Sequence, residues 1–365
     1  MKTNLTKLTL VVAMALSAFR FPLSAFAQGT LTPPGAPAAG MKSLAQIEPR
    51  TPISAAPFTI TVPGSYYLTT NLTTTVSNAI VILTNGVTLD LSGFTLTSTV
   101  ANAANGGTAI LLGSGLSDIT IGNGHIRSGV TNNGGGVYSG GGFAYGISWS
   151  GNPPQNVLAS RVSVVGCLNH GIALNNGNST GVEACMVRTV GSIGIMASTI
   201  KSSSAADCGG SAIYGDEDSD CIGQSSGGGY GIYAFTSAQS CYGTSGSSYG
   251  LYAMTAENCY GISSTGTGIQ ARSAANCYGS TVSDYGISTY IALNCCGNST
   301  GTGLYALLSA SGCYGQSALG TGLYALNASF CTGNVSGGTA IRATMATGCS
   351  AFIGTNIITY KYNMP

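Results

Sequence analysis

Residues 241–258 read CYGTSGSSYGLYAMTAEN, residues 259–276 read CYGISSTGTGIQARSAAN, and residues 277–294 read CYGSTVSDYGISTYIALN. Each stretch begins with Cys-Tyr-Gly and ends with Asn, and each has an alanine three residues before the next cysteine. The cysteines of this series recur with a constant period of 18: Cys241, Cys259, Cys277, Cys295, Cys313, Cys331 and Cys349. A short fixed period is typical of a solenoid, in which each repeat is one turn of a coil and contacts only its neighbours.

The coils can be followed through most of the chain by a step from Gly or Ala to Ile or Leu. The steps run from Ala79-Ile80 to Ala340-Ile341, with long and variable separations in the early coils and separations close to the cysteine period in the later ones. Alternating runs such as 58–62 and 87–91 predict strands, whereas helical periodicity is absent. The sequence therefore predicts an all-β parallel β-helix. Its C-terminal half consists of 18-residue coils, and its N-terminal half consists of longer coils that carry loops. About 14 coils, stacked ~4.8 Å apart, would form a rod on the order of 65 Å long.

The chain divides into three parts. Residues 1–27 have the pattern of a secretory signal peptide, with Lys2 and Lys7 before an apolar run and a small-x-small cleavage site at the end. Residues 28–57 read as a Pro/Gly-rich linker and N-terminal cap, and residues 58–365 as the β-helix domain. No later apolar run reaches the ~20 residues of a transmembrane helix. We therefore expect bacterial export of a chain without a transmembrane segment, to the extracellular space or the cell surface.

Charged residues make up only 6% of the chain, against about 25% in an ordinary domain. Removing Lys2, Lys7 and Arg20 from the 12 basic residues leaves 9, against 11 acidic residues, so the exported part has a net charge near −2. The basic surface that nucleic-acid binding requires is absent. The 55 glycines do not follow a Gly-X-Y triplet, which excludes collagen.

Two early segments resemble a known family. Residues 86–96 (GVTLDLSGFTL) and 118–127 (DITIGNGHIR) are similar to the early coils of right-handed parallel β-helix proteins of the pectate-lyase-like superfamily. The resemblance extends over residues 58–358 and is greatest to secreted bacterial members. It implies a right-handed coil. An 18-residue coil also fits the three hexapeptides of a left-handed β-helix, but an aliphatic residue at every sixth position is missing. The resemblance leaves function open, because this superfamily includes lyases, hydrolases, adhesins and proteins without a known activity.

The cysteine column is expected to face the core. A free cysteine packs as a small apolar residue beside Ala and Gly, so a stack of buried, reduced thiols is the first interpretation. Disulfides between coils are the second, and metal binding is the third, disfavoured because a packed core leaves no tetrahedral opening. Cys167 and Cys185 have the same spacing as the later cysteines and are expected to extend the column backwards. Cys296 falls in an outward position and is the expected reactive thiol.

The 18-residue period also places polar and aromatic residues at equivalent positions of successive coils. Asn258, Asn276 and Asn294 precede successive cysteines, where Asn tolerates a left-handed turn and can bond to its neighbour in the stack. Two tyrosine columns are expected to face outward, either to stabilise the sheet or to bind glycans and surfaces through their flat rings and polar tips. With Trp149 they form the predicted binding residues: Tyr233, Tyr252, Tyr305 and Tyr324 in one column, and Tyr242, Tyr260, Tyr278 and Tyr314 in the other.

Two further groups are candidates for chemistry. Asp216, Asp218 and Asp220 alternate in what reads as a loop and are candidate Ca²⁺ ligands, with a solvated acidic turn as the alternative. Asp118, His125 and Arg127 are the catalytic candidates, because His125 and Arg127 share one side of a coil near an acid. The loops 98–107, 129–143 and 148–155 would wall such a site.

These patterns predict a secreted or cell-surface solenoid with a structural or binding role. We expect its partner to be a polysaccharide or other cell-surface material, and we expect no cofactor apart from the candidate Ca²⁺. The alternative is a polysaccharide lyase or glycoside hydrolase whose site lies among the early loops. A glycoside hydrolase would need a pair of carboxylates flanking the scissile bond, and no Asp-Asp pair occurs in a predicted strand.

Overall fold

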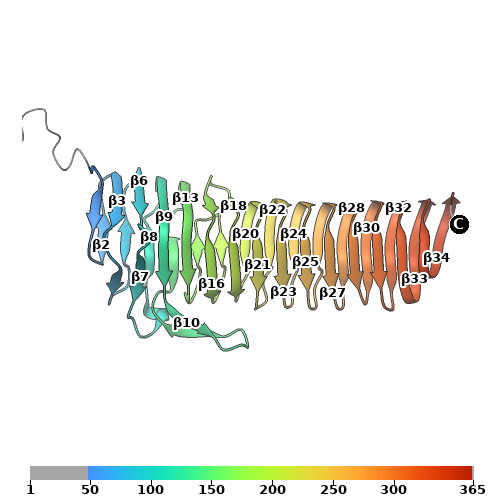
Figure 1. Ribbon diagram of the computed structural model, residues 1–365, viewed down its shortest axis with the longest axis horizontal. Coiled ribbons are helices and arrows are strands. Elements are labelled where there is room, and N and C mark those ends of the chain that lie inside the picture. The colour runs from blue at the N-terminus through green and yellow to red at the C-terminus, as the bar shows by residue number, and fades with distance from the viewer. Residues whose placement is uncertain (1–47, 364–365) are drawn as a thin grey trace, which may run out of the picture. The chain divides into compact units, whose positions relative to one another are not determined.

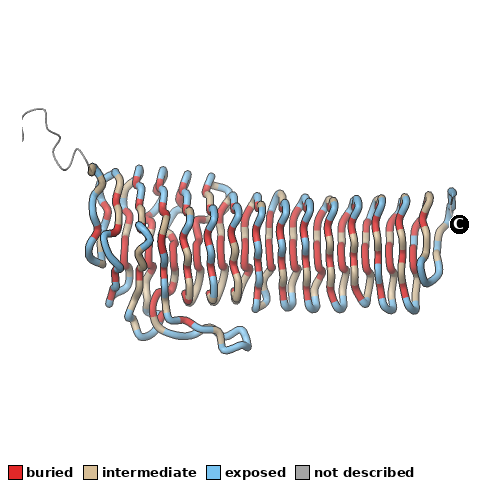
Figure 2. The backbone as a smooth tube through the Cα atoms, viewed as in Figure 1, coloured by how far each residue is buried: buried red, intermediate tan, exposed pale blue. Residues whose placement is uncertain are grey.

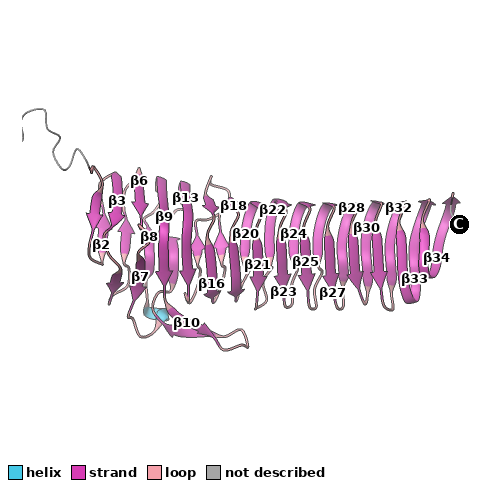
Figure 3. Cartoon of the chain, in the orientation of Figure 1, coloured by secondary structure: helices cyan, strands magenta, loops and turns pink. Residues whose placement is uncertain are grey.

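The protein is described by a computed structural model covering residues 48–363, and this part of the chain is all-β (Figures 1 and 3). It contains 34 strands, and among these residues the only helix is the single turn η1 (Ala103–Asn105). The strands form a parallel solenoid of about 17 turns, which confirms the predicted architecture. The expected number of coils was too low, because the first coils and the last one lack the Gly/Ala–Ile/Leu step. The expected signal peptide and most of the expected cap, residues 28–57, lie outside the described residues.

Each coil contributes strands to three faces, and every strand pairs with the equivalent strand one coil away. The first face contains β2 (Phe58–Ile60), β5 (Ile80–Ile82), β8 (Thr108–Leu112), β12 (Tyr145–Trp149), β14 (Ile172–Ala173) and β17 (Ile195–Met196). The second contains β1 (Thr51–Ile53), β3 (Gly64–Leu68), β6 (Val87–Asp90), β15 (Gly181–Glu183) and β18 (Thr199–Lys201). The third contains β4 (Leu72–Thr74), β7 (Thr95–Ser98), β16 (Met186–Val190), β19 (Ser204–Cys208), β21 (Ile222–Ser225), β23 (Tyr242–Ser245), β25 (Tyr260–Ser263), β27 (Tyr278–Thr281), β29 (Cys296–Ser299) and β31 (Tyr314–Ser317).

Longer strands turn a corner and join two or three faces. Two of them connect the second face to the third: β9 (Ser117–Arg127) and β13 (Gln155–Val165). Seven connect the first face to the second: β20 (Ile213–Ser219), β22 (Ile232–Gln239), β24 (Leu251–Glu257), β26 (Ile269–Ala275), β28 (Tyr285–Leu293), β30 (Thr302–Ser311) and β32 (Thr321–Ser329). The last coils run through all three faces as β33 (Thr332–Thr347) and β34 (Ser350–Tyr362). A hairpin of β10 (Gly129–Asn132) and β11 (Tyr138–Gly141) projects from the early coils (Figure 1).

The core narrows along the rod. Buried residues alternate with more exposed ones on the coils before β34 (Figure 2), as strands with one face in the core require. On the second face the inward column runs Ile121, Ala159, Val182 and Ile200 and then becomes alanine from Ala238 onward. In the later coils opposite backbones nearly touch, and a Cβ on Gly261 would lie 2.3 Å from the carbonyl oxygen of Gly268. Glycine at this position is therefore a steric requirement of the narrow core.

The cysteines line this narrow core as predicted, with one correction. All 12 are free, and all but Cys296 are buried. Cys185 continues the column, since it lies opposite Val162, but Cys167 lies one coil before Val190 in another column. The turn of chain from Val162 to Cys185 is longer than 18 residues. Two cysteines 18 residues apart in this region therefore do not occupy equivalent positions on successive coils.

Four thiols of the column make the same contacts, those of Cys259, Cys277, Cys295 and Cys331. The Sγ of Cys259 donates to the carbonyl of Glu257 at 3.1 Å and lies 3.4 Å from that of Ala238 on the previous coil. The hydrogen bond from Cys241 and burial raise the pKa of Cys259 to about 12. Hydrogen bonds from Cys277 and Cys313 lower the pKa of Cys295, and hydrogen bonds with neighbouring thiols raise the pKa of Cys277 and Cys313.

A left-handed residue at one corner precedes the cysteine column in every later coil. The amides of Asn276 and Asn294 each donate to the asparagine one coil earlier, at 3.3 and 3.4 Å, which confirms the predicted turn and stack. The corner residues with positive φ are Asn123, Arg161, Ala184, Ser202, Asp220, Ser240, Asn258, Asn276, Asn294, Gly312, Phe330 and Gly348. Glycine and asparagine adopt this conformation at low cost, whereas Phe330 at φ 51° is strained.

The last coil replaces core residues with polar ones. Asn356 of β34 lies opposite Ile341, and Lys361 lies opposite Ala346. These two columns are apolar in the preceding later coils, so the change from apolar to polar closes the core at this end, as a terminal repeat requires. Among residues 48–363, no helix is long and apolar enough to cross a bilayer.

Replacing the strained corner residue should stabilise the rod. We expect Phe330→Asn to raise the free energy of unfolding by about 1 kcal/mol, because a left-handed non-glycine residue costs ~1–2 kcal/mol and asparagine tolerates the conformation better. Phe352→Asn is the matched control, since Phe352 is also exposed but lacks a positive φ. Denaturant unfolding checks this, and equal effects of the two substitutions would contradict the strain at the corner.

Candidate functional site

The predicted tyrosine columns form, and one of them is a close ring stack. On the first face, Tyr214, Tyr233 and Tyr252 stack with centroid separations of 4.7 and 4.9 Å and interplanar angles of 7° and 4°. Tyr305 and Tyr324 continue the same column at 4.8 Å and 11°. We call these five residues the first tyrosine ladder. Its ring spacing equals the ~4.8 Å interval between paired strands, so the backbone register sets the stacking distance.

This stacking changes what the ladder presents to solvent. Rings stacked face to face along the rod cover one another's faces, and they turn their edges and hydroxyl tips outward. Tyr230 and Tyr249 lean against the ladder at centroid distances of 5.2 and 6.1 Å. Burial and the neighbouring tyrosines raise the pKa of Tyr233 and Tyr305, so these hydroxyls stay neutral. A flat ligand can therefore stack on this ladder only where a ring face is left uncovered.

Such a place exists where the ladder is interrupted. Gln270 and Ser288 occupy the two ladder positions between Tyr252 and Tyr305. A hollow of about 400 Å³ lies at the interruption, beside Tyr252 and Gln270, and its volume is within the ~300–1,000 Å³ range of small-molecule sites. We call it the ladder hollow, and its lining residues are Tyr252, Ala253, Met254, Gln270, Ala271, Arg272 and Tyr290.

The ladder hollow combines an aromatic surface with polar groups. Tyr252 stacks on Tyr233 through one face, which leaves the other face directed along the rod toward Gln270. Gln270 supplies an amide that can both donate and accept hydrogen bonds, and Arg272 supplies a guanidinium. Among the described residues, no carboxylate forms an ion pair with Arg272. An aromatic face, an amide and an unneutralised cation therefore meet in one depression.

The second column of predicted tyrosines lies on the third face and is more open. Tyr242, Tyr260 and Tyr278 follow one another at 6.4 and 5.7 Å with tilts of 34° and 38°. Cys296 interrupts this second tyrosine ladder before Tyr314. Burial raises the pKa of the Cys296 thiol, which reduces the reactivity expected from its outward position.

A polar column runs beside the second ladder on the same strands. It contains Ser280, Asn298 and Gln316, and it lines a shallow groove of about 480 Å³. Asn334 donates to the hydroxyl of Tyr314 at 2.9 Å. This groove offers amides and hydroxyls but no charged residue. Its rings are tilted, so it lacks the flat slot of the ladder hollow.

Trp149 does not join either ladder. It lies opposite Leu112 in an inward column of the first face and packs partly against the core. Its exposed side borders a separate hollow of about 470 Å³ with Tyr145 and His170, whose rings lie 5.6 Å apart. Burial lowers the pKa of His170. The sequence could not place Trp149, because the early coils do not follow the 18-residue register.

The catalytic candidates are not brought together. His125 and Arg127 project from the same side of β9 on the third face, as expected. Asp118 lies at the beginning of β9, before the strand turns the corner at Asn123, and belongs to the second face. Hydrogen bonds from Asn156 and Ser117 lower the pKa of Asp118. The three side chains therefore do not form an acid–base site.

The long loop at 129–143 is an ordered hairpin. Its Asn132 and Tyr138 donate to the carboxylate of Asp207 on β19, at 2.7 and 3.0 Å. Burial and the hydrogen bond to Asp207 raise the pKa of Tyr138. These hydrogen bonds hold the β10–β11 hairpin against β19, which is a strand of the third face.

The acidic segment is a strand and not the expected loop. Residues 213–219 form β20, which pairs with β18 and β22 and carries a register shift between Gly215 and Glu217. Asp216 accepts hydrogen bonds from Asn176 and Gly177, at 3.0 and 2.8 Å, and Asp218 turns into the core. Within residues 48–363, no three or more Asp, Glu, His or Cys side chains converge so that together they could hold one metal ion. The structure does not bring Asp216, Asp218 and Asp220 together.

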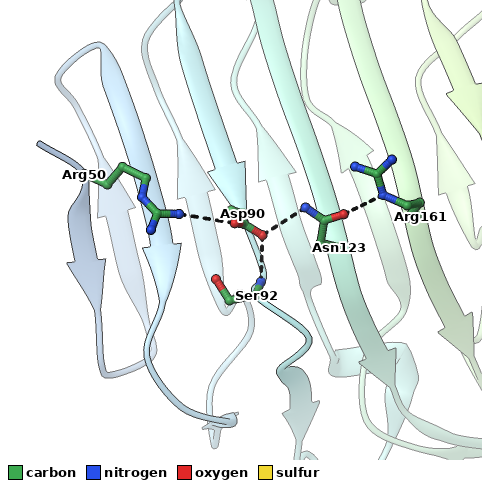
Figure 4. Close-up of polar contacts among 5 residues, drawn as sticks. All are labelled: Arg50, Asp90, Ser92, Asn123 and Arg161. Atoms are coloured by element: carbon green, nitrogen blue, oxygen red, sulfur yellow. Dashed lines mark hydrogen bonds and ion pairs between the residues drawn. The ribbon is translucent and has the colours of Figure 1, made fainter. Parts of the chain in front are cut away.

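A polar chain that the sequence did not indicate connects the early coils (Figure 4). Arg50 contacts Asp90 at 3.4 Å, Asp90 accepts from the amide of Asn123 at 3.2 Å, and Asn123 accepts from Arg161 at 2.7 Å. The backbone N–H of Ser92 also donates to Asp90 at 2.8 Å. The Arg50 and Asp90 side chains are 38% and 27% exposed, so the ion pair itself contributes little. The chain links the corners of irregular coils, a role that Asn258, Asn276 and Asn294 perform in the regular ones.

Comparisons with protein-family models, with curated proteins and with solved structures find no match. The parallel β-solenoid is therefore shown by the structure of this chain alone, the resemblance to pectate-lyase-like proteins stays a prediction, and function has to be argued from the surface of this chain.

Asp218 should limit stability at neutral pH. Both of its carboxylate oxygens are buried and lack a hydrogen-bond partner within the described structure, and burial raises its pKa well above the usual value. Asp218→Ala, which matches Ala238 on the next coil, should stabilise the fold by about 1–3 kcal/mol at pH 7.

The same substitution should change the dependence of stability on pH. Because Asp218 has a higher pKa in the folded state than in the unfolded state, the wild type loses stability as pH rises above the ordinary Asp value of ~3.9. Asp218→Ala should remove this loss. Glu217→Ala, an exposed neighbour, should not. Thermal unfolding between pH 4 and pH 9 checks this, and parallel pH curves for wild type and Asp218→Ala would contradict it.

Proposed function

We propose that this protein is an extracellular or cell-surface solenoid that binds carbohydrate in the ladder hollow. The observation that carries the proposal is the interruption of the first tyrosine ladder at Gln270 and Ser288, which uncovers the face of Tyr252. A sugar ring has an apolar face that stacks on an aromatic side chain, and its hydroxyls bond to amides and hydroxyls at the edge. Tyr252 and Gln270 supply these two kinds of contact.

The charge of the ladder hollow indicates which sugars it favours. Arg272 borders the hollow, and no described acidic residue pairs with it. A guanidinium recognises a carboxylate or a sulfate in a bidentate manner. We therefore propose acidic saccharides over neutral ones as ligands.

The rest of the rod supports a role outside the cell. Residues 285–341 contain no Asp, Glu, Lys or Arg, so solubility there depends on Ser, Thr, Asn and backbone groups. Residues 1–27 have the pattern of a signal peptide. A long, stiff and weakly charged rod with a ligand site on one face suits a protein that holds a polymer at a surface.

Completing the ladder should abolish binding. Gln270→Tyr combined with Ser288→Tyr should fill the hollow with two further stacked rings and prevent retention of acidic polysaccharides. The fold should be preserved, because tyrosine already occupies equivalent positions at Tyr252 and Tyr305. Affinity electrophoresis or retention on immobilised polysaccharides measures this.

The matched control for the double variant adds the missing ring to the second tyrosine ladder. Cys296→Tyr completes the second tyrosine ladder on the third face and should leave retention unchanged. Loss of retention in Cys296→Tyr but not in the double variant would move the site to the third face. Failure of the wild type to retain any polysaccharide of a broad panel would contradict carbohydrate binding altogether.

Removing the guanidinium should weaken binding selectively. Arg272→Ala should lower affinity for an acidic oligosaccharide by about tenfold, the loss of ~1.4 kcal/mol, and should also flatten the dependence of binding on salt. Arg342→Ala is the control, because Arg342 lies 5.9 Å from the ring of Tyr324 at the other end of the ladder. Isothermal titration calorimetry at two salt concentrations distinguishes the variants, and equal losses in both would count against the role of Arg272.

A further inference from the structure

The ladder cysteines form an uninterrupted column of sulfur atoms. Eight successive coils place a cysteine at the same corner, each directly before a residue that pairs in register with its equivalent on the next coil. Each is at most 2% exposed. The column consists of Cys221, Cys241, Cys259, Cys277, Cys295, Cys313, Cys331 and Cys349. It ends on one side at Ser203, which lies opposite Cys221 and separates Cys185 from the others.

Equivalent contacts show that four of these side chains share one orientation. The Sγ atoms of Cys259, Cys277, Cys295 and Cys331 each lie 3.4 Å from the alanine carbonyl on the preceding coil. They also lie 3.1 to 3.2 Å from the carbonyl two residues before them. Atoms in the same orientation on in-register parallel strands repeat at the strand interval of ~4.8 Å. The sulfur atoms of Cys259, Cys277 and Cys295, which lie on neighbouring coils, are therefore separated by about this distance.

We propose that this column is a binding site for soft monovalent cations of the Cu⁺ and Ag⁺ type, each held in line between the sulfurs of two successive coils. A metal–thiolate bond is ~2.3 Å long, so two bonds in line span ~4.6 Å, close to the interval that the backbone imposes. Thiolates select soft ions such as Cu⁺. Linear coordination requires two ligands and no tetrahedral opening, so the closed core that argues against zinc does not argue against these ions.

The charge balance suits a dry core. Each bound ion displaces one thiol proton to solvent and lies between the resulting thiolate and the thiol of the next coil. A thiolate that bridges two metal ions holds them at a bent angle, so ions held in line occupy every second gap. Eight sulfurs form four such pairs, so four ions would replace four protons while four thiols remain protonated. The column then stays neutral, which avoids the large cost of burying net charge. No electron is transferred, and no oxidant is required.

Silver is the probe that tests the capacity of the column. The full chain is unfolded and reduced, refolded with Ag⁺, and passed through gel filtration with excess glutathione to remove ions from accessible thiols. Bound silver is then counted by native mass spectrometry. We expect several ions, up to four, on the wild type and no retention of Zn²⁺ under the same conditions.

Variants locate the ions in the column. Cys277→Ala combined with Cys295→Ala leaves two runs of three cysteines, each able to form one pair, and should lower the maximum from four to two. Cys296→Ala removes the half-buried thiol beside the column and should leave the count unchanged. One ion or none on the wild type, or an equal count on the double variant, would overturn the proposal.

The geometry can be measured on the wild type alone, which covers the case in which the double variant does not fold. X-ray absorption of the silver-loaded protein should show two sulfur neighbours in line and no nitrogen or oxygen. Three or more sulfur neighbours would show clusters in a rearranged core and would contradict the linear site.

Discussion

The in-register pairing of successive coils is the constraint on which the rest of this structure depends. Parallel backbone hydrogen bonds fix the interval between coils at ~4.8 Å, and a left-handed corner residue allows each coil to close before the next cysteine. Any side chain that recurs with the period of the regular coil is thereby placed directly above its equivalent. The narrow core follows from the same constraint, because opposite backbones that approach at Gly261 and Gly268 leave room only for small residues (Ala, Cys, Gly, Ser and Thr) beside the aliphatic column.

The same interval decides what the surface can bind. This interval matches the stacking distance of aromatic rings. In a continuous tyrosine column the ring faces therefore contact the neighbouring rings, which stiffens the rod. The repeat is broken on the first face at Gln270 and Ser288, and Gln270 and Arg272 place polar groups beside Tyr252 in the ladder hollow. We propose that the regular coils provide the scaffold and that these two departures from regularity provide the binding site.

Much of this arrangement could be predicted from the sequence, because a strict period shows which residues lie at equivalent positions of successive coils. The inward cysteines, the asparagine corners and the two tyrosine columns all follow from counting by 18. Counting fails where loops change the length of a coil. Cys167 therefore lies outside the cysteine column despite its spacing from Cys185.

Other features depend on packing that a period does not encode. The acidic segment is a strand because β18 and β22 pair with it on both sides, and this turns Asp218 inward without a partner. The ladder hollow is visible in the sequence only as two substitutions. Whether two missing rings leave a hollow depends on how Met254, Arg272 and Tyr290 pack around the gap.

A crystal structure of the protein with a bound acidic oligosaccharide tests the central claim most directly. It should show the coils in the register described above and one sugar ring in the ladder hollow, with its flat face against Tyr252 and its acidic group at Arg272. A sugar bound in the groove of the third face or beside Trp149, with the ladder hollow filled by rearranged side chains, would contradict the account.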